Sequence, residues 1–298
     1  MKPMRIVGLV VGLTAALGAA AHGQWHAPLL ALPAAVTAQS PPAPEDLFAR
    51  HMREIGGADK LAAVKSREVR GIVRNASTGF VGRIVAQTAP PNLVHTMIEA
   101  PGITSWDTVF NGEIAWTRTV VGETTILQGD EAADLRFNSY FHAEVEAGTR
   151  FAKLETVEQL NWNERPTFRV RGTAADGRIH DTMFDAESGM IYGLISYRMG
   201  AQGPQPFVTL IVSDYKEFGG LKSPGRIVQR REGQDGEFVT TVTGVTLDSV
   251  DPAVFKADSD VQRAIDSGGR WPPKKAGEAP PPPISGPASN PAGPGQPK

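Results

Sequence analysis

Four histidines follow residue 38, and their spacing does not suit a metal site. They are His51, His95, His142 and His180, and no two of them stand at the short separation of paired metal ligands. The chain has no cysteine, so a zinc site would need carboxylates gathered from distant strands. We therefore interpret these histidines as structural, and we expect no metal and no other cofactor.

Catalytic motifs are missing from the sequence. There is no G-x-S-x-G elbow, no phosphate-binding loop and no dinucleotide fingerprint. Asp130, Glu131 and Asp134 gather acidic groups, but they stand where a helix should begin, and the helix dipole explains them. Among 32 acidic residues, a pair at glycosidase separation would arise by chance. We predict that the protein is not an enzyme; a site assembled by the fold alone is the alternative.

Aromatic residues form the most informative set. Six of them fall on a predicted hairpin and on the helix after it: Trp106, Phe110, Trp116, Phe137, Tyr140 and Phe141. They could fill an ordinary core, or some of them could line a cavity between sheet and helix, because ligand pockets are mostly apolar. We predict that this set binds a hydrophobic ligand, and that the helix over residues 130–141 acts as a movable lid.

The hairpin lies in residues 104–127. Asn111-Gly112 between alternating, strand-prone residues predicts a two-residue type I′ turn, which places Phe110 opposite Glu113. The two faces would then carry Trp106, Phe110 and Ala115 on one side and Val109, Ile114 and Trp116 on the other. Both faces hold large apolar groups, so both need to be covered.

Helical periodicity is confined to a few segments. Residues 45–55 and 59–64 predict two helices before the sheet, and residues 130–141 predict one inserted halfway along it. Elsewhere the period is two. The predicted strands are 68–75, 79–87, 93–99, 150–159, 167–172, 178–185, 190–198, 207–216, 221–231 and 237–245. We predict an α+β, mainly antiparallel fold: a strongly curved, unclosed, barrel-like sheet with helices on its concave face.

The two ends of the chain differ from the middle. Lys2 and Arg5 followed by a small, apolar run predict a signal peptide over residues 1–38, cleaved after Ala38 or alternatively after Ala21. Residues 39–44 would be a linker, 45–262 the folded domain, and 263–298 a disordered tail. That tail is rich in proline, which accounts for ten of the residues from 271 onward. An uncleaved anchor is the rival interpretation, but residues 6–21 are short of the roughly 20 that a membrane span needs.

The charge of the chain argues against polyanionic partners. The formal net charge is −2, and removal of residues 1–38 takes away Lys2 and Arg5 but no acidic residue. A mildly acidic protein gives no reason to expect a nucleic acid or an anionic membrane surface as partner. We expect no stable membrane span in the mature protein.

Several weak motifs resemble, in their order, one family of exported proteins. These are Ile55-Gly56-Gly57, Asn111-Gly112 shortly before Trp116, the turn at residues 185–189, Asp214-Tyr215-Lys216 before Gly219-Gly220, and the closing residues 251–255. Together they resemble the LolA/LolB superfamily of periplasmic, outer-membrane lipoprotein-sorting proteins over residues 47–255. The chain departs from this pattern in its proline-rich tail. It also has no N-terminal cysteine to carry the lipid of a membrane-anchored member.

The resemblance implies a periplasmic carrier or chaperone. Its ligand would be a lipid or the acyl chains of a lipoprotein, held in an apolar cavity between curved sheet and helices, with an envelope protein as a possible partner. Two non-catalytic alternatives stay open. One is a protein-interaction or sensor module of the cell envelope, and the other is a scaffold tethered by the C-terminal tail.

Overall fold

The structure is a computed structural model that describes residues 41–100, 104–119, 121–200 and 202–272. The predicted signal peptide and most of the predicted tail lie outside these residues. Its helices are α1 (Pro44–Glu54), α2 (Ala58–Ala63), α3 (Gly129–Asn138), α4 (Ala147–Arg150), the 3-10 turn η1 (Pro252–Phe255) and α5 (Ser259–Asp266). No helix in the described part of the chain is long and apolar enough to cross a membrane.

The strands before α3 are β1 (Arg67–Asn75), β2 (Phe80–Ala89), β3 (Leu93–Ala100), β4 (Thr104–Phe110), β5 (Ala115–Thr119) and β6 (Thr124–Ile126). Those after α4 are β7 (Lys153–Trp162), β8 (Arg165–Thr173), β9 (Ile179–Asp185), β10 (Ile191–Gly200), β11 (Gly203–Ser213), β12 (Lys216–Phe218), β13 (Leu221–Ser223), β14 (Arg226–Arg231), β15 (Phe238–Leu247) and β16 (Arg270–Trp271).

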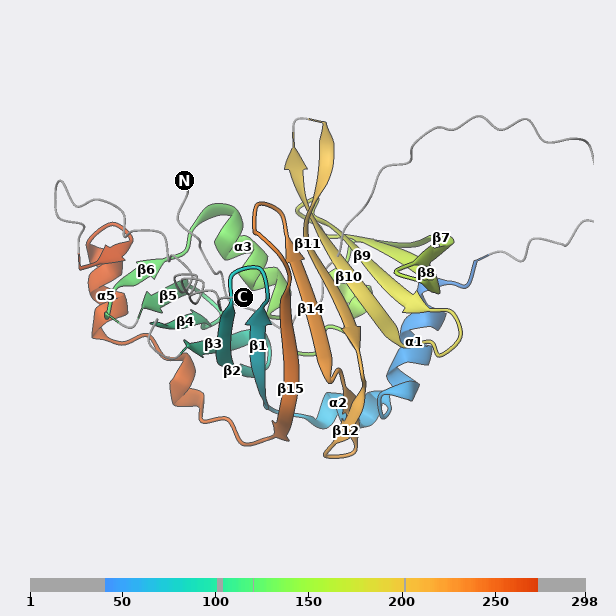
Figure 1. Ribbon diagram of the computed structural model, residues 1–298, viewed down its shortest axis with the longest axis horizontal. Coiled ribbons are helices and arrows are strands. Elements are labelled where there is room, and N and C mark those ends of the chain that lie inside the picture. The colour runs from blue at the N-terminus through green and yellow to red at the C-terminus, as the bar shows by residue number, and fades with distance from the viewer. Residues whose placement is uncertain (1–40, 101–103, 120, 201, 273–298) are drawn as a thin grey trace, which may run out of the picture.

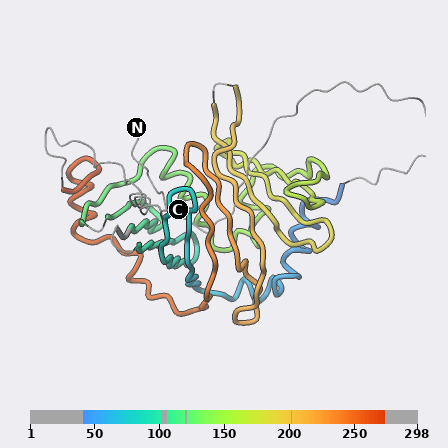
Figure 2. The backbone as a smooth tube through the Cα atoms, in the orientation of Figure 1, coloured from blue at the N-terminus to red at the C-terminus, as the bar shows by residue number. Residues whose placement is uncertain are grey.

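One large antiparallel sheet dominates the described residues. Its order is β16-β6-β5-β4-β3-β2-β1-β15-β14-β11-β10-β9-β8-β7, while β12 and β13 form a separate two-stranded ribbon. The sheet curves strongly but does not close, because β16 and β7 are its two outer strands (Figure 1). The predicted fold class is therefore confirmed. Figure 2 shows how the first strand and the last long strand, in teal and orange, lie side by side.

Helix α1 forms where the sequence predicted it. Pro44 stands in its first turn with Glu45 and Asp46, which suit the positive end of the helix dipole. Gly56 follows the helix at φ +129°, and a Cβ there would lie 2.6 Å from Leu221 Cδ2. Only glycine therefore lets the end of α1 approach β13, where the Lys222 amide donates to the Ile55 carbonyl at 2.9 Å.

Helices cover both faces of the sheet around β4 and β5. On one face Leu135 of α3 packs with Phe110 and Ala115. On the other face Val261 of α5 packs with Val109 and Trp116. The two predicted faces are thus observed, and each is buried under a different helix.

The predicted turn at Asn111-Gly112 is wrong in its register. Phe110 pairs with Ala115 rather than with Glu113, so the loop is two residues longer than a type I′ turn. The reason is the Asn111 side chain, whose Oδ1 accepts hydrogen bonds from the amides of Glu113 and Ile114. Within the loop only Gly112 has a positive φ. A shift of two residues leaves every side chain on its predicted face.

Four other segments differ from prediction. Residue 150 ends α4 instead of starting a strand, and residues 207–216 and 221–231 are divided by the β12–β13 ribbon. Ordered structure also continues past residue 262, since α5 runs to Asp266 and β16 pairs with β6. The sequence marks α5 with Asp258, whose carboxylate caps the amides of Asp260 and Val261.

Candidate functional site

A pocket lies between the sheet and the helices on the concave side. Its empty volume is about 1070 Å³, including its opening to solvent. Most of the side chains around it are aliphatic or aromatic, contributed by Phe48, Ile55, Leu61, Tyr140, Phe141, Ala143, Phe151, Ile191, Leu194, Tyr215, Phe218, Leu221, Pro224 and Leu247. The polar residues in its wall are His51, Arg67, Glu144, Arg150, His180, Thr182, Lys222 and Ser223.

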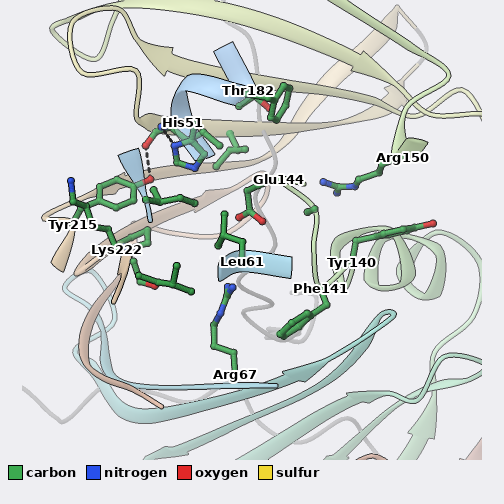
Figure 3. A pocket seen from close by; sticks show the side chains of 18 of the residues that line it. His51, Leu61, Arg67, Tyr140, Phe141, Glu144, Arg150, Thr182, Tyr215 and Lys222 are labelled. Carbon is green, nitrogen blue, oxygen red and sulfur yellow. Dashed lines mark hydrogen bonds between the residues drawn. The ribbon is translucent and has the colours of Figure 1, made fainter. Parts of the chain in front are cut away.

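Widely separated segments build this pocket. Helices α1 and α2, the segment from Tyr140 to Phe151, and strands β1, β9, β10, β12, β13 and β15 all contribute. Figure 3 shows Glu144 near the middle, with Arg150 and Tyr140 on one side and Lys222 and Tyr215 on the opposite side. Arg67 and Phe141 lie on a third side. Such a pocket combines apolar side chains with several polar groups, as small-molecule sites do.

His51 is fixed in one orientation by the backbone. Its side chain is 3% exposed, and its Nδ1 accepts a hydrogen bond from the Ile191 amide at 3.2 Å. The Tyr215 hydroxyl donates to the Ile191 carbonyl at 2.7 Å. Burial lowers the pKa of His51 to about 4, against a smaller opposing effect of Glu144. The ring is therefore neutral at pH 7, and because Nδ1 is an acceptor, the proton sits on Nε2.

Arg150 brings a charge into the pocket wall. Its Nη2 donates to the Phe137 carbonyl at 3.1 Å, and its guanidinium carbon lies 4.0 Å from the centre of the Phe137 ring. Its Nε is buried without a hydrogen-bond partner. Burial lowers the pKa of Arg150 to about 10, so the side chain stays charged at neutral pH. A cation held by one carbonyl and aromatic rings retains unused hydrogen-bonding capacity.

His180 on β9 packs against Phe137, the ring that Arg150 also contacts. Its imidazole stacks on Phe137 with centroids 4.1 Å apart and planes 8° apart. It is 4% exposed, yet neither ring nitrogen has a hydrogen-bond partner. Burial, with the nearby Arg150 and Arg178, holds the pKa of His180 well below its usual value. A buried polar ring without partners is costly unless a ligand or water satisfies it.

The six predicted aromatic residues do not gather in one place. Tyr140 and Phe141 line the pocket, but they follow α3 rather than belonging to it. Phe137 does not line the pocket, but its ring packs against Phe151 and His180, which do.

The remaining three lie away from the pocket. Phe110 is in the core under Leu135 of α3, and Trp116 is on the opposite face of the sheet under α5. Trp106 packs beside Phe80 in a third cluster. The prediction that these residues bind a ligand stays a prediction. Of the six, only Tyr140 and Phe141 line the pocket, and Phe137 packs next to lining residues.

Sequence reasoning missed the polar residues of the pocket. His51 carried one usable signal, because it interrupts the apolar stripe that Leu47, Phe48 and Ile55 form along α1. Arg150 and His180 carried none, since nothing local distinguishes them from surface residues. No group of three or more His, Asp or Glu side chains within the described ranges could hold a metal ion.

Comparisons with known proteins bear on the fold. No protein-family model matches this chain, and no curated protein matches it. Among solved structures, the chain is similar to a LolA superfamily protein from Nitrosomonas europaea, with 14% sequence identity and a TM-score of 0.52. That match covers 73% of this chain and 99% of the other.

Two further structures are similar over comparable lengths. A DUF1329 family protein from Desulfovibrio piger has 9% identity and a TM-score of 0.49, covering 71% of this chain and 96% of the other. An outer membrane lipoprotein-sorting protein domain from Vibrio parahaemolyticus has 10% identity and a TM-score of 0.43, covering 73% and 98%. The Nitrosomonas match shows that this chain has the fold of the LolA superfamily, as the sequence resemblance predicted.

Proposed function

We propose that this chain is an exported, periplasmic carrier that holds a hydrophobic ligand in the pocket between its curved sheet and its helices. The ligand would be a lipid or the acyl chains of a lipoprotein. The observation that supports this proposal is the pocket itself. It opens to solvent, most of the residues that line it are aliphatic or aromatic, and it is set in a LolA-like fold.

Burial of an acyl chain is favourable in such a space. Each CH₂ group removed from water contributes about 0.8 kcal/mol before the costs of association are subtracted. Helices α1 and α2 supply Phe48, Ile55 and Leu61 on one side of the space. Ile191 and Leu194 of β10 supply another side. The pocket thus offers apolar contacts from several directions, as a flexible chain requires.

The experiment is a binding assay with a fluorescent acyl probe on the delipidated, full-length mature protein. Phe141→Ala removes a pocket ring, and Phe80→Ala removes a ring of similar burial from a cluster away from the pocket. Each truncation is expected to cost about 3–5 kcal/mol of stability. Only Phe141→Ala should weaken probe binding. If the wild-type protein does not bind the probe, or if both variants bind it like wild type, the carrier proposal fails.

Export is part of the same proposal. The basic and apolar start of the chain supports a cleaved signal peptide, with Gln39 as the first mature residue. N-terminal sequencing of the protein from the periplasmic fraction tests this. A start at His22 would move the cleavage site to Ala21, and an intact Met1 would contradict cleavage.

A further inference from the structure

The pocket wall carries more positive than negative charge. Arg67, Arg150 and Lys222 line it together with a single carboxylate, that of Glu144. Figure 3 shows Glu144 between Arg150 and Lys222, which lie on opposite sides, with Arg67 below it. An apolar pocket that served only hydrocarbon would gain nothing from three cations, because each one costs desolvation free energy.

These cations have few partners in the protein. Among the described residues, neither Arg67 nor Arg150 forms an ion pair: Arg67 lies over the Phe141 ring at 5.4 Å, and Arg150 over the Phe137 ring. Lys222 has its Nζ 3.9 Å from Glu54, and its side chain is 46% exposed, so it lies at the mouth. Arg150 lines the pocket, stays charged and has no carboxylate within ion-pair distance among the described residues, so it is the cation with the most to gain from an anion.

The neutral His51 adds a donor to the wall, and the neutral His180 adds one donor and one acceptor. His51 carries its proton on Nε2, because Nδ1 already accepts from the Ile191 amide. His180, stacked on the ring that also carries Arg150, has a ring N–H without an acceptor. The polar groups of this wall thus consist mainly of N–H donors. A ligand head that accepts hydrogen bonds and bears negative charge would complement them.

We infer that the ligand is an anionic amphiphile, with a carboxylate or phosphate head bound beside Arg150 and a hydrocarbon chain along the apolar wall. This inference rests on the proposed function, since it assumes that the pocket holds an acyl chain. The head lies at the Arg150 end, because Arg150 lines the pocket there without a carboxylate within ion-pair distance among the described residues, whereas Lys222 already lies 3.9 Å from Glu54. Glu144 weakens the positive field near the head, and its neutralisation should tighten binding.

The test is a competition assay on the delipidated, full-length mature protein, with an uncharged fluorescent probe in the pocket. The competitors are palmitate, hexadecyl phosphate, hexadecanol and hexadecylamine, which share the same chain and differ in the head. We expect either anion, or both, to bind about tenfold more tightly than the alcohol, and the amine to bind most weakly. The better of the two anions identifies the head group.

Variants assign the effect to the pocket charges. Arg150→Met should reduce the affinity for the anions about tenfold and leave hexadecanol unchanged, and Glu144→Gln should raise anion affinity a few fold. Arg67→Met should also weaken the anions, whereas Arg74→Met on the same strand, exposed and away from the pocket, is the matched control. Arg150→Lys keeps the charge and serves if the methionine variant does not fold.

The outcomes separate this inference from the proposed function. If anions, alcohol and amine compete equally and the arginine variants change nothing, the ligand is hydrophobic but the anionic head is wrong. Tighter binding of the amine would overturn the inference in the same way. If the probe does not bind at all, the carrier proposal itself fails.

Discussion

The two faces of strands β8–β10 differ in how their buried polar side chains are hydrogen-bonded. On the face away from the pocket, Asp181 is 0% exposed and fully partnered. Arg171 donates to it twice, at 2.7 and 2.9 Å, and the Tyr197 hydroxyl donates at 2.6 Å. On the pocket face, the neighbouring His180 has no hydrogen-bond partner, and Arg150 has an unsatisfied Nε. The carboxylate of Asp181 is satisfied without a ligand, although Arg169 beside it keeps Nε and Nη1 without a hydrogen-bond partner. On the pocket face, neither nitrogen of His180 is satisfied.

The difference teaches how one sheet can combine rigidity with binding. Side chains alternate between the faces of a strand, so Asp181 and His180 are adjacent in sequence but belong to different environments. The Asp181 cluster, which we define as Asp181, Arg171, Tyr197 and Arg169, holds β8, β9 and β10 together. The favourable free energy of the Asp181 cluster can then offset the cost of polar groups on the other face that have no hydrogen-bond partner.

Removal of Asp181 should produce the largest effect. Asp181→Ala leaves Arg169 and Arg171 without their shared buried carboxylate, so we expect a loss of about 3–5 kcal/mol in the free energy of unfolding, measured in urea. Asp176→Ala removes a more exposed partner of Arg178 and should cost at most about 1 kcal/mol. A similar cost for both variants would mean that the Asp181 cluster contributes no more than a surface pair.

Acidification should affect the pocket face through its buried histidines. His51 has a pKa of about 4 in the folded protein and 6.5 when unfolded, so the unfolded chain binds its proton first as the pH falls. The free energy of unfolding should therefore drop by about 3 kcal/mol from this group between about pH 7 and pH 4. His180, with its pKa lowered too, acts in the same direction.

Urea midpoints across this pH range measure the acid effect. His51→Asn can still accept the Ile191 amide hydrogen bond but does not titrate, so its stability should depend less on pH than that of wild type. An unchanged pH slope in this variant would show that His51 is not the titrating group.

Ligand should stabilise the pocket face by a measurable amount. At a ligand concentration 100 times its Kd, the wild-type protein should gain about 2.7 kcal/mol. A tenfold weaker Arg150→Met variant at the same concentration should gain about 1.4 kcal/mol. Thermal unfolding with and without palmitate gives both values, and an equal gain for the two proteins would contradict the role of Arg150.

The smallest effect is expected for Arg150→Met without ligand. Because this variant replaces an incompletely partnered charge with an apolar side chain of similar length, the free energy of unfolding should stay the same or rise by about 1 kcal/mol. The informative result is that the free energy of unfolding changes in the opposite direction from its change in Asp181→Ala. A loss of more than 2 kcal/mol would instead assign Arg150 to the core, through its contacts with Phe137.

The sequence predicted the architecture well because its signals are local. Alternation with period two located most of the strands, and Gly56-Gly57 marked the end of α1. The hairpin register escaped because the Asn111 side chain, which can support more than one turn, decided the loop length. Helix α5 was assigned in part to the tail because the segment beyond it is rich in proline and the cap at Asp258 was not recognised.

The pocket could be predicted only in outline. The aromatic stripe predicted contacts between helix and sheet, and Tyr140 and Phe141 do line the pocket. The charged residues could not be predicted, because Arg67 of β1, Arg150 of α4 and Lys222 of the β12–β13 ribbon meet only through tertiary packing. Whether a polar side chain is buried without a hydrogen-bond partner depends on its three-dimensional surroundings, and no local sequence pattern indicates it.

The seam between β1 and β15 has a consequence for how the protein folds. Arg67 pairs with Leu247 across it, so the two halves of the sheet join only after nearly the whole domain has been made. Pairing of such distant residues slows folding, and an incomplete chain would expose the free edge of β1 to other chains. If the chain is exported as we propose, this order keeps its sheet incomplete during translocation, since β15, which joins the two halves, follows all the other long strands.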